Sequence, residues 1–346
     1  VTKGTKAREV RAEEIAVAID GRCAGECGEI VGKAFKRVVV ETMEAQKGLG
    51  RWRLSMHPEV DAAAPAKPTA GLEAVSVVRV VVLTGGGDVL PRMGSWSTED
   101  EWHDVTVGEA GDVVVRARTG WGALRAFETV SQLIEWNDGG EGSGGTFVIG
   151  RVPLAVEDWP RFRWRGMMFD VSRHFFPLRK PEQLVDAVAG MKMNVVHLPL
   201  SDAQSFPLVV ESVPGLSGRG SFSSKKATYS HSDIRQLISH ARDRGVMVVP
   251  EIDIPAHTGS WRYAGEDIVA DCWEMLLSKH GASYMENILP LNPANPATWR
   301  AVSSVIGEVS AVFDSSPFVH VGGDEVRLDC WEKAKQRPAI DKWMRE

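Results

Sequence analysis

The sequence predicts an α/β protein in which a segment of mixed α and β structure precedes a segment of alternating strands and helices. From residue 165 onward, short apolar runs alternate with amphipathic stretches of helical length. This alternation is typical of parallel strands joined by right-handed crossovers. The apolar runs lack regular polar alternation, as expected of strands that are buried on both faces.

The first part of the chain, residues 1–160, has the mixed pattern. Three β-branched runs are strand candidates, at residues 38–40, 75–83 and 113–115. Residues 120–133 predict a helix, because their apolar residues recur at helical spacing. Two stretches have the composition of linkers or loops, at residues 62–70 and 137–145. We expect a first domain over residues 1–160 and a second over residues 161–346.

The second part contains four strand candidates and three helix candidates. The expected strands cover residues 166–171, 193–200, 246–252 and 317–321. The expected helices cover residues 181–191, 232–244 and 297–313. Residues 228–232 are a start signal for the second of these helices, and Gly245 is a stop signal after it.

Each expected strand of the second part leads into polar residues. They are Asp170, Ser172, Arg173 and His174 after the first strand, Ser201, Asp202 and Gln204 after the second, Glu251, Asp253 and His257 around the end of the third, and His320, Asp324 and Glu325 around the end of the fourth. Because the carboxyl ends of parallel strands meet at one edge of a sheet, we expect a functional pocket there.

The segment Gly322-Gly323-Asp324-Glu325 carries two neighbouring carboxylates at such a strand end. Successive side chains of a strand point to opposite faces, but glycines allow the backbone to bend away from this alternation. We therefore expect both acids to face one pocket. Paired carboxylates in this position indicate acid/base or glycosyl chemistry.

The composition excludes several other classes of function. A net charge of −6 gives no basic footprint, so we expect no nucleic-acid partner. The longest apolar runs have strand length, so we expect no membrane span. No Cys-x-x-Cys pair and no closely spaced histidine pair is present, so we expect no metal and no cofactor. The four cysteines are compatible with two disulfides or with four buried thiols.

Ordered blocks of the sequence resemble the β-N-acetylhexosaminidases of glycoside hydrolase family 20. The blocks are residues 165–174, 193–207, 250–261 and 320–331, with a further resemblance at residues 121–133 to a helix of the family's small N-terminal domain. The resemblance implies an N-terminal α+β domain followed by a (β/α)8 TIM barrel, of which about the first half is present. It implies a retaining exo-acting hydrolase of N-acetylhexosamine-containing glycans, chitooligosaccharides or glycoconjugates.

The resemblance also implies a role for each site residue. The acetamido group of the substrate acts as the nucleophile, and Glu325 acts as the acid and then the base, with a pKa raised by burial and by Asp324. Asp324 orients the acetamido group. Asp202 and His257 support Glu325, and Arg165 binds sugar hydroxyls.

The resemblance further implies a Cys272–Cys330 disulfide, with Cys23 and Cys27 as a second pair. Disulfides suit an oxidising compartment, so we expect a secretory, lysosomal or extracellular location. A homodimer is left open.

Two other functions remain open. Leu198, Pro199 and Ala203 replace residues usual in the family, which favours a truncated relative or gene fragment that binds glycans without turnover. A metal-dependent hydrolase would use His174, His257, His320 and Asp324, but their spacing matches no metal motif.

Overall fold

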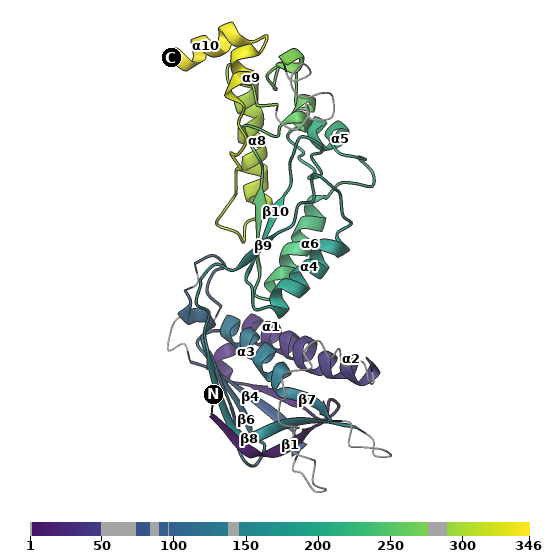
Figure 1. Ribbon diagram of the computed structural model, residues 1–346, viewed down its shortest axis with the longest axis vertical. Helices are drawn as coiled ribbons and strands as arrows, with labels where there is room; N and C mark the ends of the chain where they lie inside the picture. The colour runs from purple at the N-terminus through teal and green to yellow at the C-terminus, as the bar shows by residue number, and fades with distance from the viewer. Residues whose placement is uncertain (1, 50–73, 84–89, 96, 138–144, 276–288) are drawn as a thin grey trace. The chain divides into compact units, whose positions relative to one another are not determined.

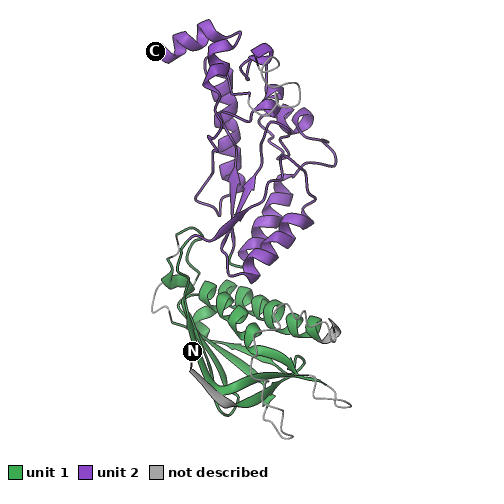
Figure 2. Ribbon diagram, viewed as in Figure 1, with its two compact units in different colours: residues 1–163, 243–245 green, residues 164–242, 246–346 purple. Residues whose placement is uncertain are grey.

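The computed structural model describes residues 2–49, 74–83, 90–95, 97–137, 145–275 and 289–346, and it divides the chain into two compact units. The first unit holds residues 1–163 and 243–245, and the second holds residues 164–242 and 246–346 (Figure 2). This division falls close to the expected boundary at residues 160 and 161. The linker expected at residues 62–70 and the centre of the loop expected at residues 137–145 lie outside the described residues.

A mixed sheet forms the first unit (Figure 1). In the described part of this unit its eight strands are β1 (Thr2–Val10), β2 (Ala16–Ile19), β3 (Ala74–Val75), β4 (Val77–Val82), β5 (His103–Val107), β6 (Val113–Ala117), β7 (Ile134–Asn137) and β8 (Thr146–Asp158). The strand order is β2-β4-β6-β5-β8-β1-β3, and β7 pairs with β8. The long strand β8 thus pairs with three others and organises the sheet.

The helices of the first unit are α1 (Glu26–Phe35), the π-helical segment Lys36–Val40, α2 (Glu41–Leu49) and α3 (Gly120–Leu133), with short 3-10 segments at Gly21–Cys23 and Glu99–Glu101. The predicted helix at residues 120–133 is confirmed. Thr119 caps it, because its hydroxyl accepts the backbone N–H groups of Trp121 and Gly122. The rings of Phe35 and Phe127 meet edge to face and join α1 to α3.

The strand predicted at residues 38–40 is wrong, because these residues continue the helical path from α1 into α2. Val31, Phe35, Val39 and Met43 are all buried and follow one another every four residues. This spacing places them on one face of a helix, and burying that face outweighs the local β preference of three consecutive valines.

A small parallel sheet forms the centre of the second unit. In the described residues its strands are β9 (Gly166–Met168), β10 (Val195–Pro199) and β11 (Met247–Glu251), in the order β11-β10-β9. Both neighbouring pairs are parallel, as the alternating sequence pattern predicts. Val196, Leu198 and Val248 belong to the main hydrophobic core of this unit. The face of the sheet that carries these three side chains is therefore the one that the helices cover.

The helices of the second unit are α4 (Arg179–Gly190), α5 (Gly215–Gly220), α6 (His231–Arg242), α8 (Pro296–Val312), α9 (Leu328–Lys333) and α10 (Arg337–Arg345), with a 3-10 segment at Gly259–Tyr263. The start signal of α6 is a capping box, since Ser230 Oγ accepts the Asp233 N–H while the Asp233 carboxylate accepts the Ser230 N–H. No helix in the described ranges is both long and apolar enough to cross a membrane.

The strand predicted at residues 317–321 is wrong as a regular strand, although the segment lies where a fourth strand belongs. Among the described residues it forms one isolated parallel bridge, from His320 to Glu251. The His320 N–H donates to the Pro250 carbonyl, and the Ile252 N–H donates to the His320 carbonyl. One further bond, from the Ile254 N–H to the Val321 carbonyl, follows the bridge, and the pairing ends where the backbone bends away at Gly322 (φ +64°).

Candidate active site

Three polar side chains of the second unit lie side by side after β10 and β11. Oxygen or nitrogen atoms of Asp202, Asp253 and His257 all lie within 4.8 Å of one another. Two hydroxyls tie the loops that carry them. Ser201 Oγ accepts the Asp253 N–H at 2.9 Å, and Ser260 Oγ donates to the Asp202 carbonyl at 2.6 Å. The structure therefore brings the sequence-predicted residues Asp202 and His257 together at the carboxyl edge of the sheet.

His257 lies between two carboxylates. Its ring is 2 % exposed, with Nδ1 2.5 Å from Asp253 Oδ2 and Nε2 3.0 Å from Glu325 Oε2. The hydrogen bond to Asp253 raises the pKa of His257 to about 9, against the opposing effect of burial and with help from Glu325. The imidazole is therefore protonated at neutral pH and donates through both nitrogens.

The glycine pair before the acids makes the turn that delivers Glu325. Both glycines have left-handed backbone angles, with φ +64° at Gly322 and φ +103° at Gly323. The Gly323 N–H donates to Asp253 Oδ1 at 3.2 Å, and a Cβ atom at Gly322 would lie only 1.8 Å from that oxygen. Asp253 therefore holds both His257 and the turn, and the close approach requires glycine at position 322.

The two acids of this turn do not share one environment. Glu325 reaches His257, but its side chain is 62 % exposed, so the expected burial is not observed. Asp324 is exposed, and no described residue donates a hydrogen bond to its carboxylate. Of the two acids, Glu325 contacts His257, and the expectation that both face one pocket stays a prediction.

Asp202 is a buried carboxylate beside a partly exposed guanidinium. Burial raises the pKa of Asp202 to about 6, against the lowering effects of its bond from the Ala203 N–H at 2.6 Å and of Arg173. Arg173 Nη2 lies 3.2 Å from Asp202 Oδ2, and its Nη1 lies 3.1 Å from Asp170 Oδ2. Asp202 acts on His257 through charge and not through a hydrogen bond.

Arg165 lies at the other edge of the sheet. It precedes β9, and its Nε and Nη2 donate to the Lys192 carbonyl at 2.9 and 2.8 Å. Its own N–H donates to Asn194 Oδ1, directly before β10. The amino ends of parallel strands lie opposite their carboxyl ends, so the structure does not place Arg165 with Asp202, His257 and Glu325.

A second cluster joins His197, Glu251 and His320. Glu251 Oε2 is 2.6 Å from His197 Nε2, and Oε1 is 3.3 Å from His320 Nδ1. The two imidazole rings lie with centroids 4.6 Å apart. Both this cluster and the Asp202–Asp253–His257 cluster have donor sets that suit a metal ion.

The residue set considered for a metal-dependent hydrolase is not assembled. His257 belongs to one cluster, His320 to the other, and Asp324 to neither. The His174 ring lies against Phe176, with ring centroids 4.7 Å apart. The four side chains therefore form no common site in the described residues.

Both disulfides are present. Cys272 pairs with Cys330, with Cα atoms 5.3 Å apart, and Cys23 pairs with Cys27, with Cα atoms 5.1 Å apart. Both pairings expected from the sequence are confirmed. The Cys272–Cys330 bond joins the segment after the His257 loop to α9, which follows the turn that carries Glu325.

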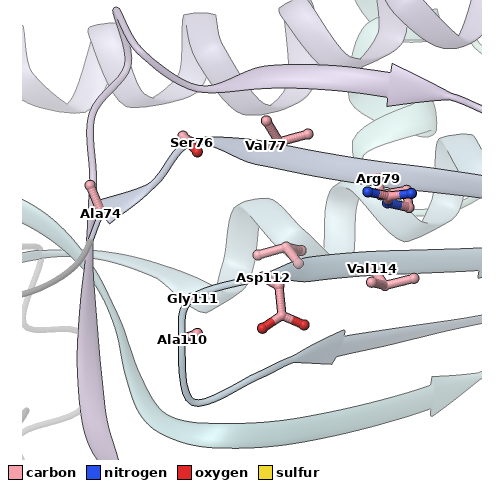
Figure 3. Close-up of a pocket in the computed structure, with 9 residues that line it drawn as sticks. Ala74, Ser76, Val77, Arg79, Ala110, Gly111, Asp112 and Val114 are labelled. Atoms are coloured by element: carbon pink, nitrogen blue, oxygen red, sulfur yellow. The ribbon is translucent and has the colours of Figure 1, made fainter.

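A cavity of about 270 Å³ opens in the first unit beside β4 and β6 (Figure 3). Its charged lining residues are Arg79 of β4 and Asp112, which precedes β6, and Ser76 between β3 and β4 also lines it. None of the residues predicted to carry chemistry lines it.

Residues 162–346 match the family described as glycosyl hydrolase family 20, catalytic domain. This match covers more than half of the chain. The chain belongs to glycosyl hydrolase family 20. The predicted α/β fold class is confirmed with it, because solved members of family 20 have the same fold.

Curated proteins from distant organisms are similar in sequence to most of this chain. A β-hexosaminidase subunit beta of Entamoeba histolytica is 35% identical over 313 residues, which cover 90% of this chain and 53% of that protein. The subunit beta of Homo sapiens is 35% identical over 282 residues, which cover 82% of this chain and 47% of that protein. The chain spans about half the length of the curated relatives it matches.

A solved structure in family 20 agrees with this result. The chitobiase of Flavobacterium johnsoniae aligns with a TM-score of 0.71 and 25% sequence identity. The alignment covers 99% of this chain and 46% of that chain.

Three site residues of this family 20 chain are poorly visible in the sequence. Asp253 and Glu251 flank the third strand end, but only the structure shows that Asp253 binds His257 and that Glu251 binds two histidines. Arg173 stands beside Asp170 in the sequence, and its contact with Asp202 crosses 29 positions. The sequence shows only that each of these residues lies near the end of an expected strand. It does not show which residue each one contacts.

Proposed function

We propose that the second unit carries the acid/base part of a retaining exo-β-N-acetylhexosaminidase site. The observation that supports this most strongly is the chain of contacts from Asp253 through His257 to Glu325. The His257 ring holds Oε2 of the Glu325 carboxyl group and leaves Oε1 free to exchange a proton with a substrate. It lies within the part of the chain that matches the family 20 catalytic domain.

In this proposal Glu325 donates a proton to the glycosidic oxygen as the bond from that oxygen to the anomeric carbon breaks. The carbonyl oxygen of the substrate's own acetamido group forms the new bond to the anomeric carbon. Water then attacks the anomeric carbon of the resulting oxazolinium ion as the bond from that carbon to the acetamido oxygen breaks, and Glu325 takes a proton from the water. Because His257 occupies Oε2, the proton passes through Oε1.

Asp324 orients the acetamido N–H and stabilises the positive charge of the oxazolinium ion in the same proposal. Its exposed carboxylate is available to a ligand. Asp202 contributes through charge on His257, while Asp253 supplies the direct hydrogen bond. The second unit therefore contributes an acid/base, its supports and an acetamido ligand.

We further propose that Arg173, and not Arg165, binds the sugar hydroxyls. Arg173 is half exposed and lies beside Asp202 at the carboxyl edge of the sheet. Arg165 is held by the Lys192 carbonyl at the amino edge. A planar guanidinium with free N–H groups suits two adjacent hydroxyls.

The proposed substrates are glycans that end in a β-linked N-acetylhexosamine, including chitooligosaccharides and glycoconjugates. The two disulfides support a secretory, lysosomal or extracellular location. A glycan-binding protein without turnover is the second candidate. It is favoured by Leu198, Pro199 and Ala203, which differ from the residues usual in the family.

Hydrolysis of an aryl N-acetyl-β-glucosaminide by the purified protein tests the proposal. Replacing Glu325 by Gln should lower kcat at least about 100-fold, whereas Glu332→Gln on the exposed side of α9 should leave it unchanged. A thiazoline mimic of the oxazolinium ion should inhibit. Turnover that is insensitive to the mimic would contradict the substrate-assisted step, and calorimetric sugar binding without turnover would select the second candidate.

A further inference from the structure

His197, Glu251 and His320 lie on one face of the sheet in the second unit. His197 pairs with Val249 across β10 and β11, so Glu251, two positions later, points to the same face as His197. His320 is bridged directly to Glu251 from the next segment. The neighbouring residues Val196, Leu198 and Val248 point to the opposite face, into the helix-covered core. The three donors therefore converge from adjacent backbones on the face that this core does not use.

The spacing of these donors is close to that around a small metal ion. Donors about 2.0–2.2 Å from a tetrahedral ion lie roughly 3.3 Å from one another. Glu251 Oε1 and His320 Nδ1 are 3.3 Å apart. Glu251 Oε2 and His197 Nε2 are 2.6 Å apart, so a rotation of the carboxylate that widens this contact completes the arrangement.

The charge of Glu251 favours a cation at this position. The residue is 8 % exposed, and its ion-pair partners in the described residues are the two imidazoles, which are charged only when protonated. A buried carboxylate without a permanent positive partner is costly. A divalent ion would balance this charge and leave both imidazoles neutral, as metal ligands must be.

His197 supplies an independent observation. Its Nε2 atom is buried and makes no hydrogen bond to any described residue, because the close oxygen of Glu251 lies off the hydrogen-bond direction. A buried ring nitrogen without a hydrogen bond is unusual in a folded protein. Coordination of an ion would satisfy this atom.

We propose that His197, Glu251 and His320 form a binding site for a divalent transition-metal ion of the zinc type. Two imidazole nitrogens and one carboxylate oxygen suit Zn²⁺ or Co²⁺, whereas Mg²⁺ and Ca²⁺ prefer oxygen donors alone. Three protein donors leave one position of a tetrahedral ion open to water. The three donors include neither His257 nor Glu325, so this proposal does not depend on the proposed hydrolase function.

Metal binding at this site also has a consequence for the turn at Gly322. The Gly322 N–H donates to His320 Nδ1 at 3.0 Å, so an ion that takes the lone pair of Nδ1 breaks this bond. A Cβ atom at Gly322 would lie 3.0 Å from Glu251 Oε1, which places the turn directly against the site. The backbone amide of Gly322 is therefore a local reporter of metal at His320.

Titration of the metal-free chain with Zn²⁺ by calorimetry, and with Co²⁺ by visible absorption, tests the proposal. We expect one equivalent to bind and Co²⁺ to show the absorption bands of a tetrahedral site. His197→Ala, Glu251→Gln and His320→Gln should each weaken Zn²⁺ binding at least about tenfold. His240→Ala is the matched control, because His240 pairs with Asp186 on the helices and should leave binding unchanged. In ¹H–¹⁵N spectra the Gly322 amide should shift on Zn²⁺ addition.

Three results would overturn the proposal. The first is the absence of stoichiometric binding by folded wild-type chain, with folding checked by circular dichroism. The second is unchanged Zn²⁺ affinity in Glu251→Gln and His320→Gln. Glu251→Gln keeps the size of the side chain, and His320 lies near the surface, so both variants preserve the fold. The third is loss of binding in Asp202→Asn with full binding in Glu251→Gln, which would assign the ion to the other donor cluster.

Discussion

Asp253 Oδ2 lies 2.5 Å from His257 Nδ1, while the other oxygen of the same carboxylate accepts the Gly323 N–H at 3.2 Å. One side chain thus fixes the imidazole and the turn that brings Glu325 to it. Any change at position 253 should therefore affect both the protonation of His257 and the position of Glu325.

Replacing Asp253 by Asn should lower the pKa of His257 from about 9 towards the ordinary value of about 6.5, because the hydrogen bond to the Asp253 carboxylate is the largest cause of the shift. Imidazole ¹⁵N chemical shifts followed against pH measure this directly. A His257 pKa that stays near 9 in Asp253→Asn would assign the shift to Glu325 and Asp202 instead.

The same shift makes stability depend on pH. A histidine whose pKa is higher in the folded state stabilises the protein fully below its unfolded pKa, and this contribution is lost as pH rises through the folded pKa. The urea midpoint of the wild-type chain should fall between about pH 6.5 and pH 9. Asp253→Asn should fall less over this range, and parallel curves for the two proteins would speak against the assignment.

Gly322→Ala should destabilise the second unit by about 2 kcal/mol or more, because the added Cβ meets Asp253 Oδ1 at 1.8 Å and the backbone angle is left-handed. Gly307→Ala is the matched control in the interior of α8, where a Cβ meets no atom within 4 Å. Gly307→Ala should raise the free energy of unfolding by about 0.5–1 kcal/mol. Urea unfolding measures both, and equal effects of the two alanines would show that the turn is not constrained by Asp253.

The two disulfides should differ in their contribution to stability. Loop closure raises the free energy of the unfolded chain. On a chain-entropy estimate this contributes about 4 kcal/mol for Cys272–Cys330, with a sequence separation of 58, and about 2 kcal/mol for Cys23–Cys27, with a separation of 4. Replacing Cys272 and Cys330 together by Ser should therefore lower the free energy of unfolding more than replacing Cys23 and Cys27. The reverse order in denaturant unfolding would show that local packing, and not loop closure, sets these energies.

Arg173→Ala should weaken binding of N-acetylglucosamine at least about tenfold, because the guanidinium at the carboxyl edge is lost. Arg165→Ala should leave this affinity nearly unchanged and lower thermal stability instead, since it removes the bonds to the Lys192 carbonyl. Calorimetry and thermal unfolding separate the two effects. Sugar affinity lost in Arg165→Ala alone would restore the assignment made from the sequence.

Much of the second unit was predictable because its periodic segments and helix caps are local. The capping box at Ser230 and Asp233 and the alternation of apolar runs with helices need no distant residue. In the first unit, the valine run at residues 38–40 failed because its β preference is local, whereas the helical face from Val31 to Met43 becomes apparent over a longer window.

The site was less predictable because its contacts cross strands. Sequence position alone located Asp202, His257 and Glu325 at strand ends, and the structure places Asp202 beside His257 and joins His257 to Glu325 by a hydrogen bond. The resemblance assigned sugar binding to Arg165, which precedes β9, whereas Arg173 follows β9 and lies at the opposite edge of the sheet, beside Asp202. The His197–Glu251–His320 cluster is drawn from three distant segments, so no ligand spacing reveals it.

His257 and Glu325 both have left-handed backbone angles, with φ +54° and φ +55°. Such angles cost on the order of 1 kcal/mol at a residue with a side chain, and Gly or Asn would relieve them. The two side chains that form this hydrogen bond thus come from backbone positions where Gly or Asn would be more stable. Selection for stability alone would favour Gly or Asn at both positions, so keeping the His257–Glu325 hydrogen bond lowers the stability of the fold.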